Sequence, residues 1–152
     1  MNYSTLQKIV FSDIDGTLID IHNGKFEGTD LLVKKLAKMG IPVILCSAKT
    51  RDEQEYIRNK LELSDPFIIE NGGAVVIPDG YFDEFEIAPH TRKNGYHLIE
   101  IGGRSSEIRK RLARIREELQ IKFKGTTDMA LEEISKKVQI PMPFAKRMSM
   151  RE

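Results

Sequence analysis

Three apolar runs lie in the first half of the chain, with amphipathic segments between them. The runs are rich in β-branched side chains, which favours buried strands. They cover residues 8–13, 42–46, and 67–69 with an extension at 74–77. Thr29 and Thr50 precede the amphipathic segments and can cap helices there, the second with Glu53 at capping-box spacing. An order of strand, helix, strand, helix and strand with short connections predicts an α/β fold on a parallel sheet.

The second half predicts a smaller α+β unit. Its boundary with the first half is expected near residues 81–86, which gives a core over residues 1–83 and a second domain over residues 84–152. Four apolar residues at spacings of four, three and four predict a helix that Ser105 or Ser106 can cap. They are Ile108, Leu112, Ile115 and Leu119. The other elements expected there are strands at 96–101 and 121–123, a helix capped by Asp128 and a last helix beginning near Pro141.

The composition is that of an ordinary globular protein. The chain has 152 residues, of which 40% are apolar and 31% are charged, enough for one domain or two very small ones. No apolar stretch approaches the roughly 20 residues needed to span a bilayer, and the first residues show no secretory signal. The single cysteine, Cys46, cannot form an internal disulfide. We therefore expect a cytoplasmic protein with no membrane partner.

The net charge of +1 hides an asymmetry between the halves. Residues 1–83 contain 9 Lys and Arg against 13 Asp and Glu, whereas residues 84–152 contain 15 against 10. A carboxylate-rich half joined to a basic half suits a metal site facing a subunit that attracts anions, although two solvated faces would give the same counts. The basic stretch at 104–116 also carries Glu107 and an apolar stripe, so we interpret it as a solvated helix face and expect no nucleic-acid partner.

Polar side chains end each apolar run of the first half. They are Asp13 and Asp15, Ser47 and Lys49, and Glu70 and Asn71. In parallel sheets, ligands bind beyond the carboxyl ends of the strands. The sequence therefore predicts that these polar groups converge on one site.

Asp13 and Asp15 are the most informative pair. Side chains two apart on a strand point to the same side, so both carboxylates can face one site while Ile14 packs in the core. The two carboxylates repel each other, and a hard divalent cation such as Mg2+ resolves that repulsion. One carboxylate could then attack an electrophile while the other transfers a proton. Gly16 would let a phosphate approach the backbone, and Thr17 would add a hydroxyl and an amide.

Ser47 and Lys49 precede the start of a predicted helix, where free amides and the helix dipole attract anions. Their hydroxyl and ammonium groups make a candidate phosphate cradle. Two simpler interpretations stay open. Ser47 could serve as a helix cap beside a solvated Lys49, and the Asp15–Gly16 pair is also typical of a hairpin turn.

Cys46 is interpreted as a buried apolar residue, and the three histidines lack metal-ligand spacing.

Several stretches together resemble a known family. They are residues 11–18, 41–51 (IPVILCSAKTR), 66–78 (PFIIENGGAVVIP), 80–82 and 124–129. The chain is similar over nearly its whole length to the haloacid dehalogenase-like (HAD) phosphohydrolases, and among them to the mannosyl-3-phosphoglycerate phosphatase family. The resemblance implies a HAD-like Rossmannoid three-layer core with an incomplete parallel sheet, and a C2-type α+β cap over residues 84–152.

The resemblance also implies roles for individual residues. Asp13 would be the nucleophile that forms an aspartyl-phosphate, Asp15 would be the acid and base, and both would bind Mg2+. The residues implied to bind the phosphate are Gly16, Thr17, Ser47 and Lys49, and those implied to contact the rest of the substrate are Asn71, Gly72, Gly73, Gly125, Asp128, Met129 and Arg151. The implied reaction is hydrolysis of mannosyl-3-phosphoglycerate to phosphate and mannosylglycerate, a compatible solute.

The resemblance breaks off after the cap. In the family, a lysine and a second acidic motif follow the cap and complete the metal site, and this sequence has no counterpart downstream of it. We therefore expect the C-terminal part of the core to be absent and the first strand to form an exposed apolar edge. A complementing chain or a homo-oligomer is the expected partner. A broader sugar phosphatase of the same superfamily and a non-catalytic binding module stay open as alternatives.

Overall fold

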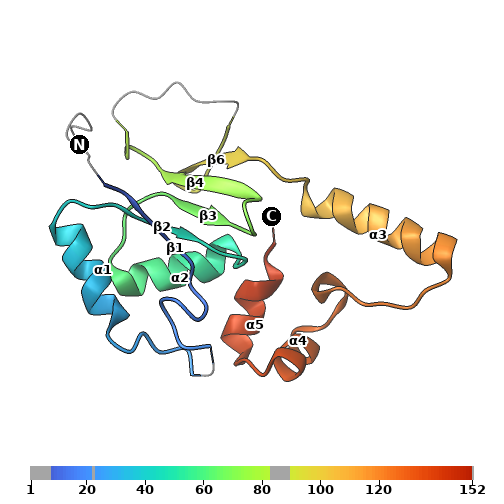
Figure 1. Ribbon diagram of the computed structural model, residues 1–152. Coiled ribbons are helices and arrows are strands. Elements are labelled where there is room, and N and C mark those ends of the chain that lie inside the picture. The colour runs from blue at the N-terminus through green and yellow to red at the C-terminus, as the bar shows by residue number, and fades with distance from the viewer. Residues whose placement is uncertain (1–7, 22, 83–89, 152) are drawn as a thin grey trace. The chain divides into compact units, whose positions relative to one another are not determined.

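The computed structural model describes residues 8–21, 23–82 and 90–151, and it has the α/β fold that the sequence predicts (Figure 1). The strands of these residues are β1 (Val10–Ser12), β2 (Val43–Cys46), β3 (Phe67–Ile69), β4 (Ala74–Pro78), β5 (Thr91–Lys93) and β6 (Tyr96–Glu100). The helices are α1 (Thr29–Lys38), α2 (Arg51–Leu61), α3 (Ser105–Leu119), α4 (Leu131–Val138) and α5 (Met142–Ser149), and a 3-10 helix covers Thr126–Asp128.

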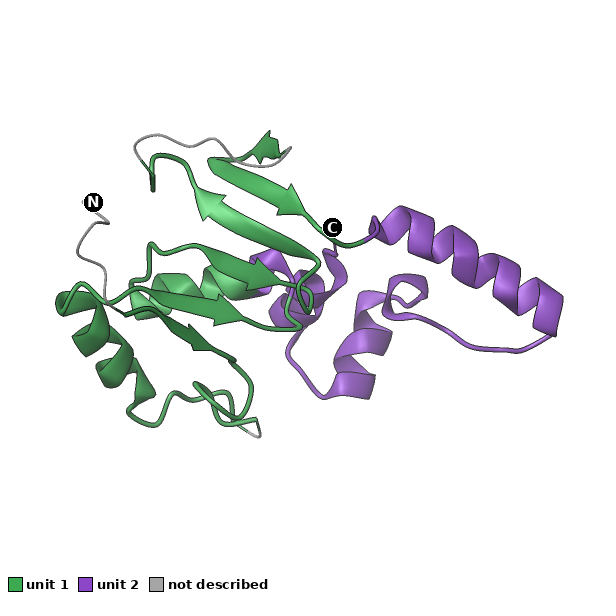
Figure 2. Ribbon diagram, turned by 45° about the horizontal axis from the view of Figure 1, so that its top comes forward, with its two compact units in different colours: residues 1–49, 54–102 green, residues 50–53, 103–152 purple. Residues whose placement is uncertain are grey.

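The chain divides into two compact units, coloured separately in Figure 2. The first comprises residues 1–49 and 54–102, and the second comprises residues 50–53 and 103–152. The sequence predicts the division near residues 81–86, whereas the units divide after Gly102. The difference arises because β6 hydrogen-bonds to β4, and β5 to β6, so both strands extend the sheet of the first unit.

The first unit is built on one sheet with the strand order β1-β2-β3-β4-β6-β5. Its first three strands are parallel, as predicted, with Val10 opposite Val43 and Leu45 opposite Phe67. The remaining pairs are antiparallel, so the sheet is mixed rather than wholly parallel. The carboxyl ends of β1, β2 and β3 therefore share one edge of the sheet, where the sequence places the candidate site.

The run at 67–77 forms two strands, and the prediction of one extended strand is wrong. Glu70, Asn71 and Gly72 have φ angles of 51°, 58° and 89°, a left-handed sequence that reverses the chain. The N–H groups of Gly72 and Gly73 close the turn by donating to the Ile69 carbonyl at 3.0 and 2.9 Å. Asn and Gly are the residues that tolerate such angles best, so the Asn71–Gly72 pair explains where the reversal falls.

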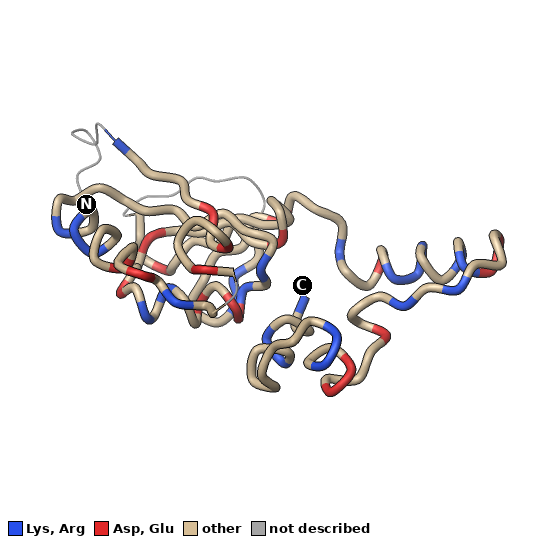
Figure 3. The backbone as a smooth tube through the Cα atoms, turned by 60° about the horizontal axis from the view of Figure 1, so that its bottom comes forward, with Lys and Arg blue, Asp and Glu red and all other residues tan. Residues whose placement is uncertain are grey.

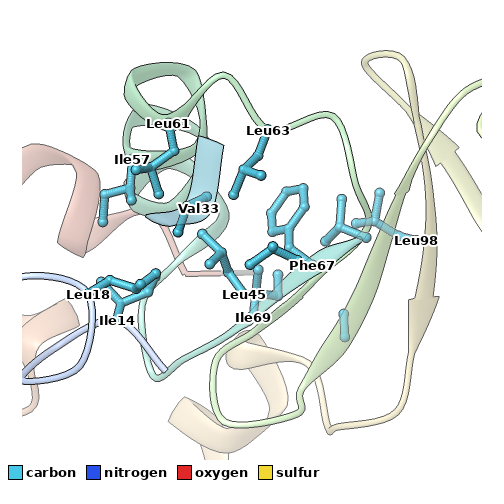
Figure 4. Packing of buried hydrophobic residues seen from close by; sticks show 13 residues of the cluster. Ile14, Leu18, Val33, Leu45, Ile57, Leu61, Leu63, Phe67, Ile69 and Leu98 are labelled. Atoms are coloured by element: carbon cyan, nitrogen blue, oxygen red, sulfur yellow. The ribbon is translucent and has the colours of Figure 1, made fainter. Parts of the chain in front are cut away.

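The core of the first unit lies between the sheet and its helices. Ile14, Leu45 and Phe67 are fully buried in it, and Val33 on α1 and Leu61 on α2 pack against them (Figure 4). Each such side chain contributes about 1.5–3 kcal/mol by leaving water. This packing fixes the strands whose ends carry the candidate site.

The two predicted helix caps have different outcomes. Thr50 and Glu53 form the expected capping box, in which the Thr50 N–H donates to Glu53 Oε2 at 2.9 Å and the Glu53 N–H donates to Thr50 Oγ1 at 3.3 Å. Thr29 does not cap α1, because its hydroxyl donates to the carbonyls of Leu18 and Phe26 at 2.5 and 2.6 Å. Gly28 takes the N-cap position instead.

The strand β1 forms one edge of the sheet, and among the described residues it pairs with β2 alone. Ile9 and Phe11 are exposed along it, Phe11 by 61%. The prediction of an exposed apolar edge is confirmed. Such an edge offers unpaired backbone groups to another strand.

The second unit is helical in its described part. The helix α3 carries basic side chains along its length (Figure 3), has no buried residue and is the solvated helix that the sequence predicts. The strand predicted at 121–123 is absent, and the Phe123 ring lies under the Arg116 guanidinium at 4.5 Å. Asp128 ends the 3-10 helix and does not cap α4, whose N-cap is Ala130.

The packing of the second unit comes from its last two helices. Ile134 on α4 and Ala145 on α5 are its fully buried apolar residues among those described. None of the described helices is long and apolar enough to cross a membrane.

Candidate active site

The loop after β1 presents two carboxylates to solvent. Asp13 and Asp15 are exposed, whereas Ile14 between them is fully buried, which is the alternation that the sequence predicts. The Ile14 carbonyl accepts N–H bonds from residues 17, 18 and 19 at 3.3, 2.9 and 3.0 Å, so the loop is tightly closed. Its turn requires a φ of 76° at Gly16, an angle that disfavours any side chain.

The alternative hairpin interpretation of the Asp15–Gly16 pair is wrong. Residues 15–19 close on themselves through a Gly16 N–H bond to the Ile19 carbonyl at 2.8 Å, and Asp15 and Ile19 form an isolated parallel bridge. No strand of the described residues pairs back along β1 here. The loop therefore ends with Gly16 and Thr17 exposed beside the two carboxylates.

An ion pair joins this loop to the turn after β2. Lys49 Nζ lies 3.0 Å from Asp15 Oδ2, with 20% of the lysine side chain and 44% of the aspartate side chain exposed. At this exposure such a pair contributes roughly 0.2–1 kcal/mol to stability, too little to be its main effect. The pair has a larger effect on the charge of the loop, because the Lys49 ammonium offsets one of its two carboxylate charges. The alternative in which Lys49 is simply solvated is wrong.

The turns after β2 and β3 are joined by backbone hydrogen bonds. The Ser47 N–H donates to the Ile68 carbonyl at 3.2 Å, the Asn71 N–H to the Ser47 carbonyl at 3.1 Å, and the Glu70 N–H to the Lys49 carbonyl at 3.1 Å. Ser47 is buried, and its Oγ accepts the Lys49 N–H at 3.4 Å. Because Oγ is the acceptor there, its own hydrogen can donate to an anion.

The Asn71–Gly73 segment lies at the same edge of the sheet. Asn71 is exposed, and the Gly73 carbonyl accepts the N–H groups of Ile101 and Gly102 at 2.9 and 2.8 Å. A Cβ built on Gly102 would lie 3.1 Å from the Gly73 Cα, so a side chain there would require the Gly73 backbone to move by a few tenths of an ångström. The structure thus brings the turns of all three parallel strands to one edge, as the sequence predicts.

The donor set for a metal consists of two carboxylates. Magnesium is usually held by one or two carboxylates together with water and substrate phosphates, so Asp13 and Asp15 fit an ion that keeps much of its hydration. Within the described ranges, no group of three or more His, Cys, Asp and Glu side chains lies close enough to hold a metal. One Asp15 oxygen also contacts Lys49, which leaves the other for a cation.

The other candidate residues lie in the second unit. Gly125 and Asp128 share the 3-10 turn, where the Gly125 N–H donates to Asp128 Oδ2 at 3.0 Å and Arg116 also binds that carboxylate. The Gly125 bond, and then Arg116, lower the pKa of the Asp128 carboxyl. Met129 follows this turn, and Arg151 is half-buried near the end of the described residues. Their contact with a substrate stays a prediction.

Gln54 is a residue of this site that the sequence analysis missed. It is fully buried on α2, and its Nε2 donates to the carbonyls of Ile68 and Lys49 at 2.7 and 3.5 Å. A signal is present in the sequence: Gln54 precedes Ile57 and Leu61 by three and seven residues, and therefore occupies the apolar stripe of its helix. A polar residue in such a stripe marks a specific hydrogen-bonding role.

Comparison with known proteins gives close sequence relatives. The chain is 38% identical over 140 residues to the mannosyl-3-phosphoglycerate phosphatase of Pyrococcus furiosus, covering 91% of this chain and 56% of that protein. It is 35% identical over 133 residues to the glucosyl-3-phosphoglycerate/mannosyl-3-phosphoglycerate phosphatase of Persephonella marina, covering 88% and 48%. The chain thus spans about half the length of the curated relatives it matches.

The fold has relatives as well. A haloacid dehalogenase-like hydrolase from Bacteroides thetaiotaomicron superposes with a TM-score of 0.58 at 17% identity, covering 95% of this chain and 51% of that one. Residues 10–100, which include both carboxylates and all three turns of the site, match the haloacid dehalogenase-like hydrolase family. Phosphatases of this kind generally use Mg2+. The chain therefore belongs to the haloacid dehalogenase-like hydrolases.

Proposed function

We propose that this chain acts in the Mg2+-dependent hydrolysis of mannosyl-3-phosphoglycerate to mannosylglycerate and phosphate. The observation that carries the proposal is the arrangement at the end of β1, where Asp13 and Asp15 are exposed and Asp15 pairs with Lys49 of the turn after β2. The names of relatives that are 35–38% identical support the substrate.

The reaction proceeds in two displacements at phosphorus. A carboxylate oxygen of Asp13 attacks the phosphorus and forms an aspartyl-phosphate as the bond from phosphorus to the alcohol oxygen breaks, and Asp15, which enters this step protonated, gives its proton to that departing oxygen. Asp15 then takes a proton from water, whose oxygen attacks the same phosphorus and releases Asp13 and inorganic phosphate. A bound Mg2+ would neutralise charge on the phosphoryl oxygens. Asp13 and Asp15 would supply its protein ligands.

The remaining residues bind and orient the substrate in this proposal. The Lys49 ammonium, the Ser47 hydroxyl and the exposed Gly16–Thr17 loop provide donors for the phosphate oxygens. The residues proposed to contact the sugar and glycerate parts are Asn71, Gly72, Gly73, Gly125, Asp128, Met129 and Arg151. The assignment of residues 84–152 to a cap, and a location in the cytoplasm, remain predictions from the sequence.

The decisive test is Asp13→Asn, assayed by phosphate release from mannosyl-3-phosphoglycerate with Mg2+ and with the C-terminal half of the Pyrococcus furiosus relative added to both chains. We expect turnover to fall by at least about 10³-fold, because an amide cannot replace the attacking carboxylate. Asp30→Asn on α1 removes a carboxylate from the same unit and should leave turnover near that of the unmodified chain. Equal turnover of the Asp13→Asn variant and its parent would exclude the nucleophile assignment, and binding of substrate without turnover in either chain would favour the binding module.

A broader sugar phosphatase is the second candidate. The relatives from Persephonella marina and Methanococcoides burtonii are named for both the glucosyl and the mannosyl compound. Comparing kcat/KM for these two substrates and for simple sugar phosphates separates the candidates. A mannosyl-specific enzyme discriminates among them, whereas a general phosphatase does not.

The partner in this proposal is a chain that supplies the other part of the HAD core, with a homo-oligomer as the alternative. The proposal is supported by the position of β1 at the edge of the sheet, where it pairs with β2 alone among the described strands, and by the half-length match to the relatives. Turnover should rise when the chain is mixed with the C-terminal half of the Pyrococcus furiosus relative. A full enzymatic rate without any addition would remove the need for a complementing chain.

A further inference from the structure

Gln54 lies on the face of α2 that packs in the core. Its side chain is 0% exposed, and it shares the inner stripe of α2 with the buried residues Ile57 and Leu61. A buried amide is unfavourable unless its polar atoms find partners. The partners that Gln54 finds are both in the candidate site.

The amide of Gln54 joins two turns. Nε2 donates to the Ile68 carbonyl at 2.7 Å, which also accepts the Ser47 N–H, and to the Lys49 carbonyl at 3.5 Å, which also accepts the Glu70 N–H. Because both partners are carbonyl acceptors, only the NH2 end of the side chain can face them. One amide therefore holds two of the three carbonyls through which the turns after β2 and β3 are connected, the third being that of Ser47.

The oxygen of the same amide, Gln54 Oε1, is buried and has no hydrogen-bond partner among the described residues. A leucine or methionine would fill the same stripe without leaving a buried acceptor unpaired. The presence of glutamine at this cost indicates that the two donated bonds matter for something other than packing.

We propose that Gln54 is a positioning residue of the phosphate site. By fixing the Lys49 and Ile68 carbonyls, it holds the Ser47–Lys49 turn against the Glu70–Asn71 turn and so keeps the Lys49 ammonium beside Asp15. It touches neither the substrate nor the reacting atoms and acts through the two backbone turns. Its effect on the reaction rests on the proposed function, whereas its effect on the turns does not.

The first measurement is hydrogen exchange of the Ser47 and Glu70 amides in Gln54→Met, which keeps the length of the side chain but removes both donors. We expect exchange at these two amides to accelerate about five- to tenfold, as the loss of one or two ordinary hydrogen bonds allows. Ile57→Val, which trims the same face of the same helix, is the control. The Val10 N–H, which donates to the Pro42 carbonyl at 2.9 Å, reports any general loosening of the sheet.

The second measurement is the affinity for inorganic phosphate in the presence of Mg2+. We expect Gln54→Met to weaken it several-fold and to raise KM more than it lowers kcat, while Ile57→Val changes neither. Gln54→Leu repeats both measurements with a second apolar side chain. Equal exchange at Ser47 and Glu70 in the Gln54 and Ile57 variants overturns the proposal, whatever the activity. Accelerated exchange in a chain that neither binds phosphate nor turns over would refute the proposed function and leave the role in the turns intact.

Discussion

At the scale of single residues, charge compensation is the main feature of the site. Asp13 and Asp15 place two negative charges after the end of β1, and Lys49 adds one positive charge at 3.0 Å from Asp15. The remaining negative charge suits a cation, and the ammonium suits an anion, so the same few atoms favour a metal and a phosphate together.

Replacing Lys49 tests the anion side of this arrangement. We expect Lys49→Met to weaken the binding of inorganic phosphate about tenfold, because a hydrogen bond to a charged group contributes roughly 1.5 kcal/mol. Isothermal titration calorimetry with Mg2+ present measures the change. Lys34→Met removes a lysine that pairs with Glu62 elsewhere in the first unit and serves as the control. Unchanged affinity in the Lys49 variant would show that the ammonium does not meet the anion.

Asp79 gives a prediction about pH. The Arg92 guanidinium donates to Asp79 Oδ2 at 2.7 and 3.1 Å, and this hydrogen bonding lowers the pKa of that carboxyl. Desolvation opposes the shift, and the positive charge of Arg92 adds to it. A lowered pKa means that the pair stabilises the fold above the ordinary carboxyl range and that this contribution is lost as the pH falls through the lowered value. Arg92→Ala should therefore raise the Asp79 pKa, which NMR titration of the carboxyl carbon measures. Thr91→Ala, on the same strand, should leave the titration of Asp79 where it was.

The sequence predicts where the candidate residues lie better than it predicts the contacts that hold them. That Asp13, Asp15, Ser47 and Lys49 follow strands whose ends meet at one edge of the sheet could be predicted, whereas their chemical roles stay predictions. Gln54 could not be assigned in the same way. Its role depends on which carbonyls happen to lie within reach of its amide, and that is decided by the packing of α2 on the sheet.

At the scale of elements, local backbone chemistry decides where the fold departs from the simplest pattern. An apolar run interrupted at residues 70–73 looks like one long strand, but three consecutive left-handed residues make it a hairpin. The alternation at residues 121–123 is typical of a strand, yet no neighbouring strand of the described residues pairs with it. Short strands form only with a partner, and the sequence pattern does not contain the partner.

The start of α2 can be tested by removing its cap. Thr50→Ala should lower the free energy of unfolding by about 0.5–2 kcal/mol, because it leaves the Glu53 N–H without its acceptor and also removes the hydroxyl that donates to the Arg147 carbonyl at 2.9 Å. Ser105→Ala is a matched control, because no side-chain hydrogen bond caps the start of α3. Urea unfolding of the two variants gives the comparison. Equal destabilisation would mean that the capping box does not hold α2.

At the scale of the whole molecule, the free edge of β1 is the most consequential surface. Parallel strands are normally buried within their sheet, whereas β1 exposes Phe11, follows the exposed Ile9 and pairs with β2 alone among the described strands. The family and the α/β class could be predicted from the sequence, and so could this edge. The extent of the first unit could not, because the pairing of β6 with β4 joins segments that the apolar pattern places in different halves.

A charge on this edge should block unwanted pairing. We expect Phe11→Lys to reduce the self-association of the chain at high concentration, since charged side chains on edge strands oppose the addition of another strand. Sedimentation velocity over a range of concentrations measures the effect. Leu31→Lys alters an equally exposed apolar side chain on α1, away from any strand edge, and should reduce association less. The same reduction in both variants would point to general surface polarity as the cause.

The hairpin at residues 70–72 has a consequence for how the chain is routed. After the hairpin, β4 runs away from the edge of the sheet where Ser47 and Asn71 lie. The strand β6 is antiparallel to β4 and returns the chain to that edge, with Glu100 opposite Ala74. After these two reversals the backbone reaches Gly102 beside Gly73, at the edge of the sheet where the turns after β2 and β3 lie. The chain that continues to residues 103–152 thus leaves the first unit at the same edge of the sheet as the turns of the candidate site.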